Sequence, residues 1–98
     1  MKLPKSFRLF GKTWSVKKKK LGESGNTCIH RAQVQIDPRD TSPGQVRATL
    51  LHEVVHAIEG DLELKMSEKL TSRLSVAMYG WMRDNPDVVK WLMEKESK

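Results

Sequence analysis

Two histidines stand four residues apart in the segment His52-Glu53-Val54-Val55-His56, with a carboxylate beside the first of them. On a helix, residues i and i+4 lie on one face with Cβ atoms roughly 5–6 Å apart, so both imidazole rings can reach one metal ion. Glu53 lies about 100° further round the helix, where its carboxylate can reach a water molecule on that metal. The segment therefore predicts half of a zinc site, with His52 and His56 as metal ligands and Glu53 as the catalytic general base.

The composition of the chain makes a chance occurrence of this pattern rare. The chain contains three His and seven Glu among 98 residues. A random shuffle of these residues is expected to contain the pattern about 0.006 times per sequence. The alternative interpretation is an ordinary amphipathic helix with two solvated histidines. The flanking segments decide between the two interpretations, because a ligand pair needs a helix that presents it away from the apolar core.

A catalytic zinc site normally has three protein ligands and one position open to water, so a third ligand must come from elsewhere. Glu68 is the first candidate, because it opens the next helix and antiparallel packing across a short link would bring it back toward His56. Alternatively, Glu68 is not a ligand and its negative charge only stabilises the N-terminus of that helix. Glu59 could also accept a hydrogen bond from an imidazole N–H. The other candidate ligands are Glu59, Asp61, Glu63 and His30.

The segments before the motif indicate strands. Residues 6–18 alternate as an antiparallel hairpin with Trp14 in its core, and Gly11 at the turn can adopt the positive φ that a tight turn requires. Residues 27–37 then predict a third strand with alternate residues on one face. This face is expected to turn toward the helices and carries Cys28, His30, Ala32, Val34 and Ile36.

Capping residues predict three helices. Ser42 followed by Pro43 is typical of a helix start, and Gly60 of its end. Ser67 is expected to cap a second helix, which ends before Pro86, where a third begins. The apolar stripe of the first helix leaves out His52 and His56, as a ligand pair requires. Core filling is expected from Met66, Met78, Trp81, Met82, Trp91 and Met93.

These elements predict an α+β fold in a single domain spanning residues 1–98. An antiparallel N-terminal hairpin and a third strand pack on the motif helix, and two further helices follow. A domain of this size buries only about 60–65% of its unfolded surface, so any cleft must be shallow. The single Cys28 excludes an internal disulfide. We expect no signal peptide, no membrane span and a cytoplasmic location, and the sequence does not indicate an oligomeric state.

Positive charge and one strand suggest where partners could bind. The formal net charge is +6, and Lys17 to Lys20 form an uninterrupted basic run, which attracts nucleic acid or acidic proteins. The run could equally be a solvated strand end and turn. His30 and Arg31 are candidate substrate-binding residues, because a strand that borders the cleft could pair with an extended peptide.

The chain resembles small, often phage- or prophage-encoded HExxH metallopeptidase-like proteins of the gluzincin kind, related to antirepressor and SprT-like proteases. The resemblance covers residues 34–86 and is carried by Val34-Gln35-Ile36-Asp37, by the block from Thr49 through the motif to Ile58, and by Ser67-Glu68. It implies that His52 and His56 bind Zn²⁺, that Glu53 is the acid/base and that Glu68 completes the site. A phage-encoded relative would act in the cytoplasm of a bacterial host.

Three functions are compatible with these features. The leading hypothesis is a zinc-dependent metallopeptidase that hydrolyses peptide bonds with a metal-activated water. The alternative is a non-catalytic, zinc-stabilised basic module that binds nucleic acid or an acidic protein. A third interpretation is a structural protein with a vestigial motif, which would bind no metal.

Overall fold

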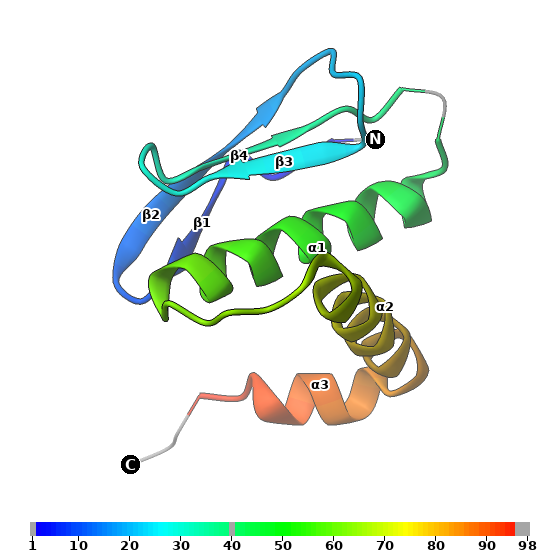
Figure 1. The fold of residues 1–98 in the computed structure, drawn as a ribbon. Coiled ribbons are helices and arrows are strands. Elements are labelled where there is room, and N and C mark those ends of the chain that lie inside the picture. Colours follow the sequence, from blue (N-terminus) through cyan, green and yellow to red (C-terminus); the bar gives the residue numbers. More distant parts are fainter. Residues whose placement is uncertain (1, 40, 96–98) are drawn as a thin grey trace.

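A four-stranded mixed sheet with one long helix across one of its faces forms the body of the protein (Figure 1). The computed structural model describes residues 2–39 and 41–95. The strands are β1 (Ser6–Leu9), β2 (Lys12–Lys18), β3 (Gly25–Cys28) and β4 (Gln33–Ile36). The helices are α1 (Pro43–Asp61), α2 (Glu68–Asp84) and α3 (Pro86–Leu92). The predicted α+β fold is confirmed.

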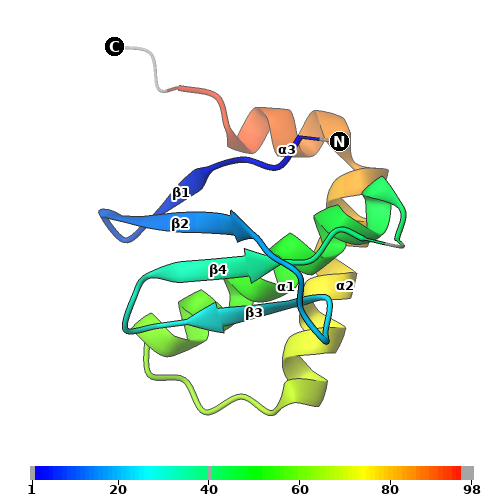
Figure 2. The same cartoon turned by 90° about the horizontal axis from the view of Figure 1, so that it is seen from above.

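The strands lie in the order β1-β2-β4-β3, which Figure 2 shows from above the sheet. β1 and β2 form the predicted antiparallel hairpin, with Leu9 opposite Lys12. Its two turn residues, Phe10 and Gly11, both have positive φ (50° and 76°), as the turns that match strand twist require. β4 then runs parallel to β2 and antiparallel to β3, so β3 is an edge strand.

The prediction of one strand over residues 27–37 was wrong, because the chain reverses within it. β3 and β4 form a second hairpin, whose turn is closed by a hydrogen bond from the Ala32 backbone N–H to the Ile29 carbonyl, with Ala32 at φ 47°. A turn of Ile29-His30-Arg31-Ala32 has no Gly, Pro or Asn to mark it. His30 lies exposed in this turn and does not face the helices, contrary to our expectation.

α1 and α2 begin where their capping serines predicted, and α3 begins at Pro86, as expected. Ser42 Oγ accepts a hydrogen bond from the Gln45 backbone N–H, and Ser67 Oγ accepts one from the Leu70 backbone N–H, both at 3.1 Å. These bonds satisfy N–H groups that the first helical turn leaves unpaired. α1 ends one residue beyond Gly60, whose missing side chain leaves room for Ile29 of the β3–β4 turn. α1 is therefore held close under the edge of the sheet that carries β3.

The connection that leads into α1 is fixed by Asp37. Its carboxylate accepts hydrogen bonds from the Leu21 backbone N–H at 2.8 Å and from the Arg39 guanidinium at 2.8 and 2.9 Å. The Arg39 side chain, followed by the Leu21 N–H, holds the pKa of Asp37 well below its usual range. This corner joins the β2–β3 loop to the segment before α1 and so sets where α1 starts.

The core lies between the sheet and α1. Trp14 is fully buried there, as predicted. Buried apolar partners from both layers are Val16, Val34, Ile36, Val46 and Ala57. The expectation that methionines and tryptophans of the last two helices fill the core was wrong for four of them. The four are exposed: Met78 to 38%, Trp81 to 47%, Trp91 to 67% and Met93 to 76%. Among the described residues, no helix has the length and apolar composition needed to span a bilayer.

Candidate metal centre

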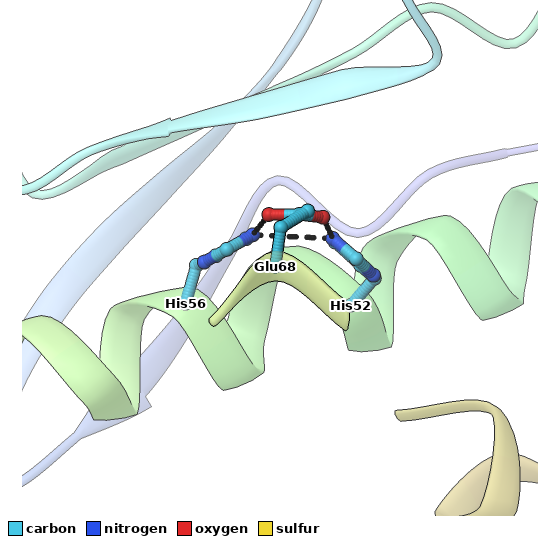
Figure 3. A group of neighbouring side chains, drawn as sticks. All are labelled: His52, His56 and Glu68. Carbon is cyan, nitrogen blue, oxygen red and sulfur yellow. Dashed lines mark hydrogen bonds and ion pairs between the residues drawn. The ribbon is translucent and has the colours of Figure 1, made fainter. Parts of the chain in front are cut away.

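His52 and His56 project from adjacent turns of α1, and their Nε2 atoms lie 3.1 Å apart. Glu68, the first residue of α2, reaches both rings: its Oε1 lies 2.8 Å from His52 Nε2, and its Oε2 lies 2.9 Å from His56 Nε2. Figure 3 shows the carboxylate placed between the two rings. The link from α1 to α2 folds back as the sequence predicted, and the three side chains form a group that could hold a metal ion.

The spacing of these donor atoms fits a tetrahedral ion. Metal bonds of about 2.0–2.1 Å at tetrahedral angles place two donor atoms roughly 3.3–3.4 Å apart. The two histidine nitrogens lie 3.1 Å apart, and they lie 2.8 and 2.9 Å from different oxygens of Glu68. A small outward shift of the side chains, with Glu68 turned to present one oxygen to the ion, would let two nitrogens and one oxygen coordinate it. Two imidazole nitrogens and one carboxylate oxygen are a donor set of catalytic zinc sites. The Glu68 side chain is 66% exposed, so solvent reaches this centre.

The outer nitrogen of His56 is held by a carboxylate on the same helix. His56 Nδ1 lies 3.2 Å from Glu59 Oε2, and the Thr71 hydroxyl of α2 donates to the same oxygen at 3.3 Å. Because a carboxylate can only accept in this contact, Nδ1 is the protonated nitrogen of the ring. Glu59 therefore orients His56, which is the role that the sequence left open for it beside direct ligation.

The outer nitrogen of His52 is held by a hydroxyl on α2. Ser75 Oγ donates its hydrogen to the Ser72 carbonyl at 3.1 Å and lies 3.3 Å from His52 Nδ1. With its own hydrogen engaged, Ser75 Oγ accepts from His52 Nδ1–H. Both rings thus carry a hydrogen on Nδ1. The Nε2 atoms, which face Glu68, are the nitrogens that would coordinate a metal ion once they give up the hydrogen shared with that carboxylate.

Thr71 and Ser75 are site residues that our sequence analysis did not predict. Both are buried, with 0% and 2% of their surface exposed. A signal was present, because Glu68, Thr71 and Ser75 recur at spacings of three and four residues and form a polar stripe on one face of the helix. Read as a helical face, this stripe identifies the side of α2 that packs on the histidines.

Glu53 lies on the face of α1 that packs against the sheet, and it is only 5% exposed. The Thr27 hydroxyl of β3 donates to Glu53 Oε1 at 2.7 Å. A side chain at Gly25 would come within 3.0 Å of the Gln35 carbonyl and 3.2 Å of Glu53 Oε2, so glycine lets the edge strand pass this close. Burial raises the pKa of the Glu53 carboxyl, and the Thr27 hydrogen bond and both neighbouring histidines oppose the rise. A carboxylate with raised proton affinity is suited to proton transfer.

These groups line one open cavity of about 560 Å³ between β3, the second half of α1 and the link to α2. Its lining contains no Lys or Arg, so the cavity is acidic although the chain is basic overall. The cavity brings together His52, His56 and the glutamates at positions 23, 53, 59, 63 and 68.

The other sequence candidates lie apart from the donor group. Glu63 lines the cavity but does not belong to the group, and neither Asp61 nor His30 belongs to it. His30 and Arg31 are exposed and lie outside the cavity lining, whereas their neighbour Ile29 is part of it. Of the five predicted third ligands, Glu68 joins the donor group, and Glu59 contacts His56 at its outer nitrogen instead.

We compared the chain with protein-family models, with curated proteins and with solved structures, and none of the three comparisons found a match. The resemblance to HExxH metallopeptidase-like proteins stays a prediction from the motif. The geometry around His52, His56 and Glu68 is therefore the basis for assigning a function.

Proposed function

We propose that this protein is a zinc-dependent metallopeptidase. The observation that supports this most strongly is the convergence of His52, His56 and Glu68 within a cavity whose wall includes the buried Glu53. Three ligands leave one coordination position for water, as catalytic rather than structural zinc sites do. In this proposal His52, His56 and Glu68 hold the ion, and Glu53 is the general base.

A bound zinc ion polarises the substrate carbonyl and lowers the pKa of water to about 7. Glu53 accepts a proton from the attacking water and passes it to the nitrogen of the leaving amine, while the water oxygen bonds to the carbonyl carbon and the C–N bond breaks. The Thr27 hydroxyl occupies Glu53 Oε1, and Oε2 has no hydrogen-bond partner among the described residues. Oε2 is therefore the oxygen available to the proton. Glu59 and Ser75 keep the two ligand rings in place.

The substrate is proposed to be an extended peptide segment that pairs with β3. β3 is an edge strand, and Gly25, Asn26 and Thr27 of this strand line the cavity. Unpaired backbone groups of an edge strand can bind a peptide by adding it to the sheet. Glu23 and Glu63 in the lining favour cationic over acidic side chains in that peptide. Contact of His30 and Arg31 with a longer peptide stays a prediction.

Zinc-loaded protein is expected to cleave members of a random library of unstructured peptides. Cleavage is expected to stop when a chelator removes the metal and to return when zinc is restored, because the attacking water is activated by the bound zinc ion. Mass spectrometry of the products gives both the rate and the cleaved bonds, and His52→Ala protein prepared in the same way is the control. Stoichiometric zinc without any cleavage of the library would exclude the peptidase proposal.

A second candidate function is binding of nucleic acid through the sheet. Residues 1–39 contain ten Lys or Arg and two Asp or Glu, whereas residues 40–98 contain eight and ten. Lys17 to Lys20 are exposed, and no described helix covers the face of the sheet opposite α1 (Figure 1). This candidate places the basic surface away from the acidic cavity.

Binding through the sheet is expected to be strongly salt-dependent. Each phosphate contact contributes about 0.9 to the slope of log K against log salt, because counterions are released. Fluorescence anisotropy with labelled single- and double-stranded DNA should show this slope, and glutamine at positions 17–20 should reduce it. Absence of binding at low salt, or binding that salt does not change, would remove this candidate.

A further inference from the structure

Helix α2 leaves its apolar stripe exposed to solvent, next to the side that packs on the metal centre. Leu70, Leu74, Met78 and Trp81 recur at helical spacing, and they are 51%, 42%, 38% and 47% exposed. An amphipathic helix normally buries such a stripe. Here the adjacent side of α2 is buried, because it supplies Thr71 and Ser75 to the metal centre. The stripe is therefore left without a described partner.

Helix α3 and the residue after it extend this exposed apolar surface. α3 packs against α2 and lies on the side of the molecule away from the sheet (Figure 1). Three apolar residues of α3 and the methionine that follows it are also well exposed. Together with the α2 stripe they define the α2–α3 apolar face. This face consists of Leu70, Leu74, Met78, Trp81, Val88, Trp91, Leu92 and Met93.

The size of the α2–α3 apolar face matches one half of a stable protein dimer. From their exposed fractions, these side chains leave roughly 900 Å² accessible, whereas the largest apolar patch of a typical monomer is about 300–600 Å². A standard interface buries about 800 Å² on each partner. Aromatic residues and methionine, which are enriched in interfaces, make up half of the face.

Charges beside the α2 stripe are arranged so that two copies of this helix complement each other. Arg73 flanks the stripe in the first half of α2, and Asp84 lies on the same flank at its end. In an antiparallel pair of helices the same flank of each faces the other, so Arg73 of one copy meets Asp84 of the second. No described residue forms an ion pair with Arg73 or Asp84.

We propose that the α2–α3 apolar face binds a second copy of this chain and forms a two-fold dimer with antiparallel α2 helices. A two-fold axis closes such a contact, so both copies bury the same surface and no open filament forms. No residue of this face lines the cavity. The dimer would therefore cover the exposed stripe of α2, while the adjacent side still holds Glu68, Thr71 and Ser75 at the metal centre.

Sedimentation equilibrium over a range of concentrations tests this proposal. Wild-type protein is expected to approach twice the mass of the chain. Leu74→Glu is expected to raise the dissociation constant of the dimer at least roughly 30-fold, as loss of a buried anchor does. Val76→Glu is the matched control, since Val76 is 67% exposed on the same helix but lies off the stripe. Unchanged zinc binding and circular dichroism would show that both variants fold.

Charge reversal tests the antiparallel arrangement. Arg73→Glu alone should weaken the dimer, and Arg73→Glu combined with Asp84→Arg should restore it, because both ends of the contact change sign together. A wild-type protein that stays monomeric at its highest soluble concentration would overturn the proposal and leave the face to a different protein. Open-ended aggregates, or equal effects of Leu74→Glu and Val76→Glu, would overturn it as well. Failure of the paired reversal would overturn the antiparallel geometry.

Discussion

Glu53→Gln is expected to abolish peptide cleavage while the protein still binds one zinc ion. The amide keeps the size of the side chain, and its oxygen can still accept the hydrogen bond that Thr27 donates to Oε1. It cannot accept a proton from water, which removes a contribution of about 10²–10⁴-fold to the rate. Turnover on a cleaved library peptide and zinc content, measured on the same sample, check this prediction.

Glu63→Gln is the matched control for Glu53→Gln. Glu63 also lines the cavity, so both variants remove one negative charge from the same wall, but Glu63 has no part in the proposed proton transfer. The control should therefore keep most of the cleavage rate. A thermal unfolding curve separates catalysis from folding: an amide avoids burying a charge, so Glu53→Gln should not lower the melting temperature. Cleavage at the wild-type rate in Glu53→Gln would contradict the proposed role.

Removal of a metal ligand is expected to weaken zinc binding far more than removal of a residue that orients one. His56→Ala and Glu68→Ala each delete a donor atom of the group. Glu59→Ala deletes the acceptor that His56 Nδ1 and the Thr71 hydroxyl share, and loss of such an outer contact costs about 10–100-fold in affinity. We expect larger losses for the two ligand variants, measured by competition with a chelating dye.

Two controls make the ligand series specific. Glu63→Ala removes a carboxylate from the cavity lining without touching the donor group, so it reports the effect of charge alone. Glu68 also provides a negative charge at the N-terminus of α2, which is worth only about 0.3–1 kcal/mol and cannot account for a loss above 10-fold. If Glu68→Ala bound zinc like the wild type and Glu59→Ala or Glu63→Ala did not, the third ligand would be reassigned.

The sequence by itself determined the helices and half of the metal centre, because both depend on short-range rules. Ser42 and Ser67 accept backbone hydrogen bonds from residues three positions later, and Pro86 disfavours helical geometry in the residue before it. The helix ends therefore depend on residues close in sequence. The four-residue spacing of His52 and His56 puts both rings on one face of any helix. The return of Glu68 followed from the short link between two capped helices.

Only the tertiary structure decided which partners those local elements meet. Period-two alternation continues through residues 29–32, so the sequence could not mark the reversal that makes β3 an edge strand and puts Thr27 beside Glu53. Nor could the apolar stripe of α2 reveal that it stays exposed. Packing energy alone would bury that stripe. Instead the side that carries Thr71, which donates to Glu59, and Ser75, which accepts from His52, packs against α1. Which side is buried depends on contacts between residues distant in sequence, and these exist only once the chain has folded.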